Sequence, residues 1–73
     1  MEYSKIHDTI IENIKNVMKE NGYKSKHVAS QLGWTPMTYS NLLNGRRTLK
    51  SEYLPYIARA IGCDVNRLFE GTM

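Results

Sequence analysis

Five glycine residues divide this 73-residue chain, and each follows a stretch in which apolar residues recur every three or four positions. Glycine is favoured just past a helix end, because it adopts the left-handed backbone conformation without a Cβ clash. No stretch alternates apolar and polar residues as a half-buried strand does. The sequence therefore predicts five helices, which end near Gly22, Gly33, Gly45, Gly62 and Gly71.

The first two predicted helices are recognised by the spacing of their apolar residues. The first is expected to bury Ile6, Ile10, Ile14, Val17 and Met18. The second is expected to run from Lys24 to Leu32 and to bury Val28, Ala29 and Leu32.

The other three helices are recognised by residues suited to a helix start. Thr35 can cap free backbone N–H groups, and Pro36 suits the first helical position of a helix that ends near Asn44. Asp64 is expected to cap the last helix. The fourth is expected to be capped by Ser51, to tolerate Pro55 in its first turn, and to bury Leu54, Ile57, Ala58 and Ile61.

Length and composition limit what the chain can do. A single domain of this size, residues 1–73, buries only about 60% of its unfolded surface, so a deep active-site cleft is not expected. No paired carboxylates, Ser/His/Asp set or glycine-rich phosphate loop is present, so we expect no enzyme activity. The lone Cys63 excludes an internal disulfide and agrees with a cytoplasmic location. No stretch approaches the roughly 20 apolar residues of a membrane span.

Positive charge is concentrated in the middle of the chain. Residues 21–51 contain five basic residues and no acidic one, a charge of +5, whereas the remainder has five basic and seven acidic residues, a charge of −2. Such a segment suits a polyanion, although a solvated basic surface has the same composition.

The second and third predicted helices are joined by the short turn Gly33-Trp34-Thr35. Two short helices joined so tightly must cross steeply, and the small side chain of Ala29 permits the close contact. This arrangement lets the later helix project its exposed face into a DNA major groove about 12 Å wide.

Several short motifs together match one family. They are Val28-Ala29 with Leu32-Gly33, Leu42-Leu43-Asn44-Gly45-Arg46-Arg47, Leu54, Ile57-Ala58, Ala60-Ile61-Gly62 and Leu68-Phe69. From about Glu12 to Phe69 the sequence resembles the phage-repressor, Cro-like (XRE-type) helix-turn-helix regulators. The resemblance implies an all-α, compact five-helix bundle in which helices 2 and 3 form the helix-turn-helix. It also implies a regulator, expected to be a repressor, that binds double-stranded DNA.

The resemblance implies that residues 36–43 form the recognition helix, with Tyr39 and Leu42 pointing inward. Asn41 is the preferred base reader, because a carboxamide can pair with adenine N7 and N6, although an exposed asparagine without a role is the alternative. Pro36 and Met37 stand where the family often has polar or basic residues. The implied base contacts are Pro36, Met37, Thr38, Ser40 and Asn41.

Contacts to phosphates are implied on both sides of this helix. Arg46 and Arg47 are expected to grip phosphates, although ordinary solvated charges remain the alternative. Asn44 and Gly45 are expected to offer amide groups, and Ser25 stands where the family often has glutamine. The implied phosphate contacts are Lys24, Ser25, Lys26, Thr35, Asn44, Gly45, Arg46, Arg47 and Lys50.

Trp34 and Tyr39 are expected to pack in the core, where the polar tip of either could reach the DNA backbone. One module makes a small interface, so a homodimer on a two-fold-related operator is expected, with Leu68, Phe69 and Met73 as candidate dimer contacts. An alternative is an antitoxin or anti-repressor that binds a partner protein. No cofactor, metal or small-molecule ligand is expected.

Overall fold

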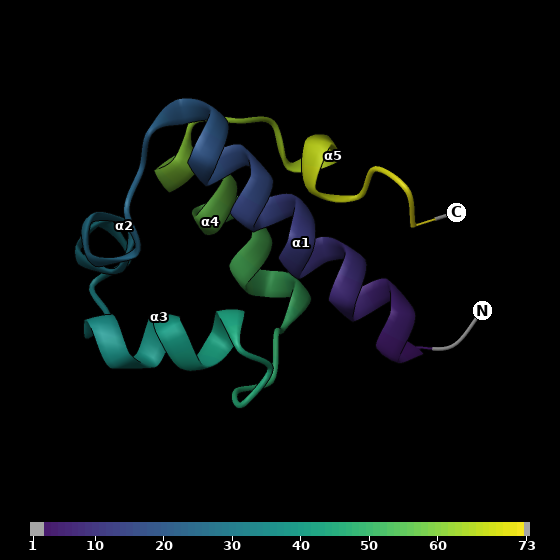
Figure 1. The fold of residues 1–73 in the computed structure, drawn as a ribbon, viewed down its shortest axis with the longest axis horizontal. Helices are drawn as coiled ribbons and strands as arrows, with labels where there is room; N and C mark the ends of the chain where they lie inside the picture. Colours follow the sequence, from purple (N-terminus) through teal and green to yellow (C-terminus); the bar gives the residue numbers. More distant parts are fainter. Residues whose placement is uncertain (1–2, 73) are drawn as a thin grey trace.

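The computed structural model describes residues 3–72, and all regular structure in this range is helical (Figure 1). The prediction of five helices is confirmed. The elements are α1 (Tyr3–Asn21), α2 (Ser25–Leu32), α3 (Pro36–Leu43), the 3₁₀ turn η1 (Ser51–Tyr53), α4 (Leu54–Ile61) and α5 (Val65–Leu68).

Helix α4 lies at the centre of the fold and packs against α1, α2 and α5, while α3 packs against α2. The α4 face formed by Leu54, Ile57, Ala58 and Ile61 is buried as predicted. All five helices contribute to one core, whose fully buried large side chains are Ile14, Val17, Val28, Tyr39, Leu42, Ile57, Ile61 and Leu68.

Two predicted core residues lie at the edge of this core. Ile6 is only partly buried, because it lines an open pocket near the start of α1. Leu32 is also partly buried, because it ends α2 beside the surface aromatics Trp34 and Tyr56. By contrast, Ile11 is buried although the three-and-four spacing did not select it.

Two of the predicted helix caps are confirmed. Thr35 Oγ1 accepts a hydrogen bond from the Thr38 N–H at 3.2 Å, and Pro36 is the first residue of α3. Asp64 Oδ1 accepts from the Asn66 N–H at 2.9 Å at the start of α5. Helix α2 begins one residue later than predicted, at Ser25.

The predicted capping of the fourth helix by Ser51 is wrong. Ser51 begins η1, and α4 begins three residues later at Leu54. The N–H groups of Tyr53 and Leu54 already donate to the carbonyls of Lys50 and Ser51. The Ser51 hydroxyl is therefore not needed to satisfy those amides. Pro55 falls in the first turn of α4, as predicted.

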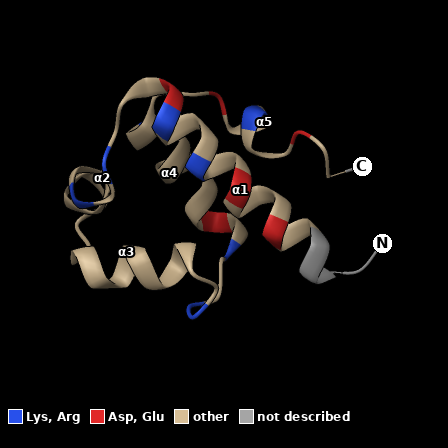
Figure 2. Cartoon of the chain, viewed as in Figure 1, with Lys and Arg blue, Asp and Glu red and all other residues tan. Residues whose placement is uncertain are grey.

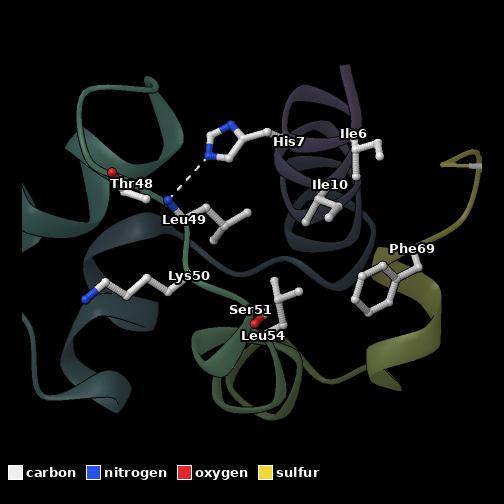
Figure 3. Close-up of a pocket in the computed structure, with 9 residues that line it drawn as sticks. All are labelled: Ile6, His7, Ile10, Thr48, Leu49, Lys50, Ser51, Leu54 and Phe69. Carbon is white, nitrogen blue, oxygen red and sulfur yellow. Dashed lines mark hydrogen bonds between the residues drawn. The ribbon is translucent and has the colours of Figure 1, made fainter. Parts of the chain in front are cut away.

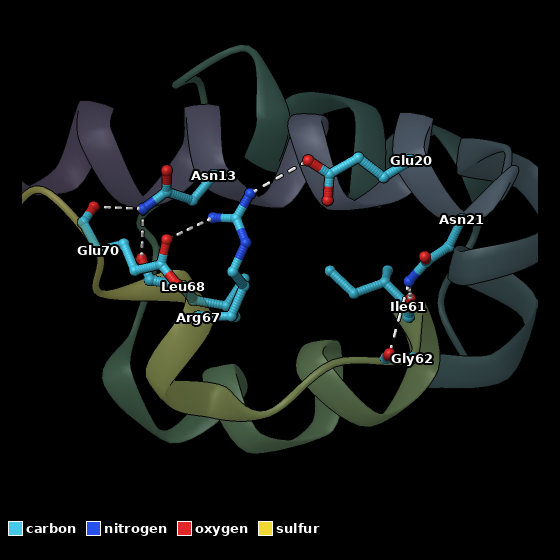
Figure 4. A network of polar contacts seen from close by, with 8 residues as sticks. All are labelled: Asn13, Glu20, Asn21, Ile61, Gly62, Arg67, Leu68 and Glu70. Atoms are coloured by element: carbon cyan, nitrogen blue, oxygen red, sulfur yellow. Dashed lines mark hydrogen bonds and ion pairs between the residues drawn. The ribbon is translucent and has the colours of Figure 1, made fainter.

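Polar side chains of α1 hold the C-terminal part of the chain in place (Figure 4). Asn21 Nδ2 donates to the Ile61 carbonyl at 2.8 Å, and Asn13 Nδ2 donates to the Leu68 carbonyl at 2.9 Å. Arg67 forms an ion pair with Glu20 at 3.4 Å. These contacts fix the ends of α4 and α5 against α1, and α4 in turn supports α2.

Candidate nucleic-acid interface

A tight turn orients α3 relative to α2. In Figure 1, α2 is seen end-on while α3 runs across the view, so the two axes cross steeply. Gly33 has φ of 74°, in the left-handed region that favours glycine, and the Trp34 N–H donates to the Ala29 carbonyl at 2.9 Å. Ala29 has no exposed surface, so the small contact residue lies where the turn requires it.

Helix α3 separates its apolar residues from its outward-facing ones. Tyr39, Leu42 and Leu43 face the core. Pro36 and Ser40 are exposed, and Met37 is 73% exposed. Two other predicted base readers, Thr38 and Asn41, are half-buried.

Two pairs of polar side chains on the outward side are already hydrogen-bonded within the protein. The hydroxyls of Thr35 and Thr38 lie 2.9 Å apart, and the Asn44 side-chain amide donates to Ser40 Oγ at 3.3 Å. Hydroxyl and amide groups retain further bonding capacity, so these contacts orient the side chains without using them up.

The backbone after α3 turns back onto the helix. The N–H groups of Arg46 and Arg47 both donate to the Asn41 carbonyl, at 2.8 and 3.2 Å. The Asn44 N–H donates to the Ser40 carbonyl at 3.0 Å, and the Gly45 N–H to that of Leu42 at 3.2 Å. The expectation that backbone amides of Asn44 and Gly45 serve phosphates is therefore wrong, because both donors close the end of α3.

A comparison with protein families now bears on this geometry. The helix-turn-helix family model HTH_3, of the XRE and Cro type, matches residues 14–68, which include α2, the turn and α3. The chain belongs to this family. It is a DNA-binding regulator of the XRE type, and double-stranded DNA is the ligand that the family binds. No curated protein and no solved structure gives a match.

Positive charge surrounds α3 in this helix-turn-helix domain (Figure 2). Lys24 and Lys26 lie at the start of α2, while Arg46, Arg47 and Lys50 lie in the segment that follows α3. All five side chains are exposed. The α3 sequence itself has no charged residue, so the cations flank a neutral reading surface.

Sequence analysis missed two cations that α1 adds to this surface. Lys15 and Lys19 line one hollow together with Lys24 and Ser25 of the α2 start and with residues of the α3 end. In the sequence they belong to the acid-rich remainder of the chain. Their spacing of four residues places them on one helix face, but only the packing of α1 brings that face beside α2.

The aromatic residues of the turn have different environments. Tyr39 is fully buried as expected, and its hydroxyl donates to Met18 Sδ at 3.2 Å, so the suggestion that it reaches the DNA backbone is wrong. Burial also raises the pKa of Tyr39. Trp34 is only partly buried. Its ring packs edge-on against that of Tyr53, with 5.2 Å between the ring centroids, and the Arg47 guanidinium lies over the Trp34 ring.

The predicted dimer contacts are only partly accessible. Leu68 has no exposed surface, because it fills the core between α1 and α4, and its proposed role as a dimer contact is wrong. Phe69 is 42% exposed and lines an apolar pocket with Ile6 and Ile10. Met73 lies outside the described residues.

No helix within residues 3–72 is long and apolar enough to cross a bilayer. The same residues contain no group of three or more His, Cys, Asp or Glu side chains arranged to hold a metal ion. Cys63 is half-buried, and this burial raises the pKa of its thiol.

Proposed function

We propose that the domain is a transcriptional repressor that inserts α3 into the DNA major groove and acts by occupying its site. The observation that carries this proposal is the neutral outward side of α3 between exposed cations from α1, α2 and the following segment. Phosphates lie along both edges of a major groove, so a reading helix flanked by cations matches the charge of the duplex.

The base-reading roles follow from exposure and chemistry. Met37 is the exposed large apolar side chain of α3 and suits contact with a thymine methyl. Asn41 suits a paired contact to adenine, and Pro36, Thr38 and Ser40 complete the reading set. Because α3 contains no arginine, specificity rests on shape, methyl contacts and one carboxamide.

The phosphate contacts are proposed in two groups. The first group comprises the cations after α3, Arg46, Arg47 and Lys50, together with Thr35, Asn44 and Gly45 at the two ends of α3. Gly45 contributes because it has no side chain that could obstruct the DNA strand. The second group combines the α2 start with α1 and comprises Lys24, Ser25, Lys26, Lys15 and Lys19. The amides of the first turn of α2 add positive character there.

A homodimer on a two-fold-related operator completes the proposal. A single small module makes a limited interface, so two modules whose sites are one helical turn or more apart give useful affinity. Phe69 is the exposed apolar residue proposed for the contact. Sedimentation of the free protein and of the complex on a palindromic duplex measures the stoichiometry.

Selection from a pool of random duplexes tests the reading role. The wild-type protein should recover a two-fold-related motif, and Asn41→Ala should lose about 1–3 kcal/mol of discrimination at one base pair in each half-site. Asn16→Ala, which alters an exposed asparagine on α1, is the matched control and should recover the wild-type motif. Recovery of no motif by the wild type would contradict sequence-specific binding. An unchanged preference in Asn41→Ala would contradict the assignment of that residue.

A second candidate function is that of an antitoxin or anti-repressor, which binds a partner protein. The exposure of Phe69 beside an apolar pocket favours it. Salt titration of duplex binding separates the two functions. The seven cations assigned to phosphates predict a log–log slope of about −6 for each module, whereas a protein-only binder has no DNA affinity to titrate.

A further inference from the structure

The segment of residues 44–50, here called the basic loop, is fastened to α1 by one side chain. The Leu49 N–H donates to Nε2 of His7 at 3.3 Å (Figure 3). The Leu49 residue is itself only 6% exposed, so its amide lies away from bulk water. This hydrogen bond joins the C-terminal end of the basic loop to α1, a helix outside the helix-turn-helix unit.

The bond is the second of two attachments that hold the basic loop. Near the start of the loop, the N–H groups of Arg46 and Arg47 are held by the Asn41 carbonyl. Farther along, the His7 contact holds Leu49, which directly precedes Lys50. The three cations proposed to grip phosphates therefore lie between or beside these two attachments.

The His7 contact requires one protonation state. Nε2 can accept a hydrogen bond only when it carries no proton, so the ring proton must be on Nδ1. The Asp8 carboxylate lies 3.9 Å from Nδ1 and favours this arrangement. Protonation of the ring places an N–H on Nε2 opposite the Leu49 N–H, and two donors then face each other.

Charged groups of both signs lie near the ring. Asp8, on the same helix, places a carboxylate oxygen 3.9 Å from Nδ1, and Lys50 of the basic loop lines the same pocket. Ser51 of η1 and Phe69 of the C-terminal segment also line this pocket and carry no charge.

We propose that His7 is a positioning residue whose neutral form holds the basic loop in its DNA-binding conformation and whose protonation releases it. This inference rests on the proposed function, because the loop matters through its phosphate contacts. The contribution of His7 to affinity is present at alkaline pH and is lost as the ring gains a proton. Histidine is the side chain whose charge ordinarily changes between about pH 5 and 8.

Binding of a fluorescent random-sequence duplex, about two DNA turns long, tests the proposal at constant ionic strength. His7→Gln supplies a non-titrating acceptor near the Nε2 position, and His7→Leu keeps bulk but supplies none. At about pH 8 the wild type should match His7→Gln. At about pH 5 it should bind about tenfold more weakly than His7→Gln, the ratio expected for one lost hydrogen bond. Both proteins keep the exposed His27, so its contribution is the same on both sides of this comparison.

His7→Leu should bind about tenfold more weakly than His7→Gln at both pH values. Parallel pH profiles for the wild type and His7→Gln would overturn the proposal. A second measurement needs no variant. The protection factor of the wild-type Leu49 amide, which compares its exchange rate with that of an unstructured peptide at the same pH, should fall below about pH 6 more than that of the Arg46 amide. Equal behaviour of the two amides would also overturn it. Absence of duplex binding at every pH would instead contradict the proposed function, while the exchange measurement still tests the hydrogen bond.

Discussion

The guanidinium carbon of Arg47 lies 5.7 Å from the ring centroid of Trp34, within cation–π distance. The contact joins the segment after α3 to the turn before it. Trp34 immediately precedes the Thr35 cap, so the cation of Arg47 is held close to the entrance of the reading helix. The pair reduces the freedom of a long side chain before DNA arrives.

A double-mutant cycle should detect this pairing. Trp34→Leu, Arg47→Ala and the double variant should show a coupling of about 0.5–1 kcal/mol in the free energy of unfolding, the size of an exposed cation–π contact. Urea denaturation at low salt measures it. Pairing Trp34→Leu with Arg46→Ala is the matched control, and equal coupling in the two cycles would contradict a specific Arg47 contact.

Removing both arginines of the basic loop should weaken binding to all duplexes alike. Arg46→Ala with Arg47→Ala removes two proposed phosphate contacts, so the log–log salt slope should become shallower by about two. Fluorescence anisotropy at several salt concentrations measures the slope. Replacement of both arginines by lysine keeps the charges and should preserve the slope. A selective loss of one DNA sequence would instead indicate base contact.

The lysines of α1 should contribute although they lie outside the helix-turn-helix unit. Lys15→Ala with Lys19→Ala should lower affinity for every duplex and reduce the salt slope by up to about two, because both side chains border the α2 start. Asn16→Ala, on the same helix, is the control for helix disruption. If the double variant keeps the wild-type slope, α1 does not contact the phosphate backbone.

Stability should fall at alkaline pH because of Tyr39. Burial raises the pKa of this phenol in the folded protein, whereas an unfolded tyrosine titrates near pH 10. Above about pH 10 the unfolded state loses a proton that the native state keeps, so the free energy of unfolding decreases as pH rises.

Tyr39→Phe should therefore show a weaker decline in stability between about pH 9 and pH 11 than the wild type. The variant keeps the ring and loses only the hydrogen bond to Met18, so it should cost no more than about 1 kcal/mol at neutral pH. Urea denaturation across this range provides the comparison. Parallel curves would show that the phenol ionises equally in the folded and unfolded states.

Local chemistry made much of the fold predictable. The cap at Thr35 and the start at Pro36 depend on residues that are neighbours in sequence, so local chemistry predicted the observed start of α3, and the family resemblance supplied its end at Leu43. The buried face of α4 follows from helical spacing alone. The prediction of a helix cap at Ser51 was wrong because serine begins several kinds of turn. Here it begins a 3₁₀ turn, whose backbone hydrogen bonds satisfy the amides that a cap would serve.

The candidate site was predictable only in part. The acid-free segment and the family motifs located α3 and its flanking cations, because these residues are close together in the chain. Tertiary packing decided the remainder: it brought Lys15 and Lys19 beside α2, buried Leu68, and set His7 against Leu49, 42 residues away. Such contacts depend on how the helices pack around one core, and no local sequence pattern specifies which faces of two distant helices meet.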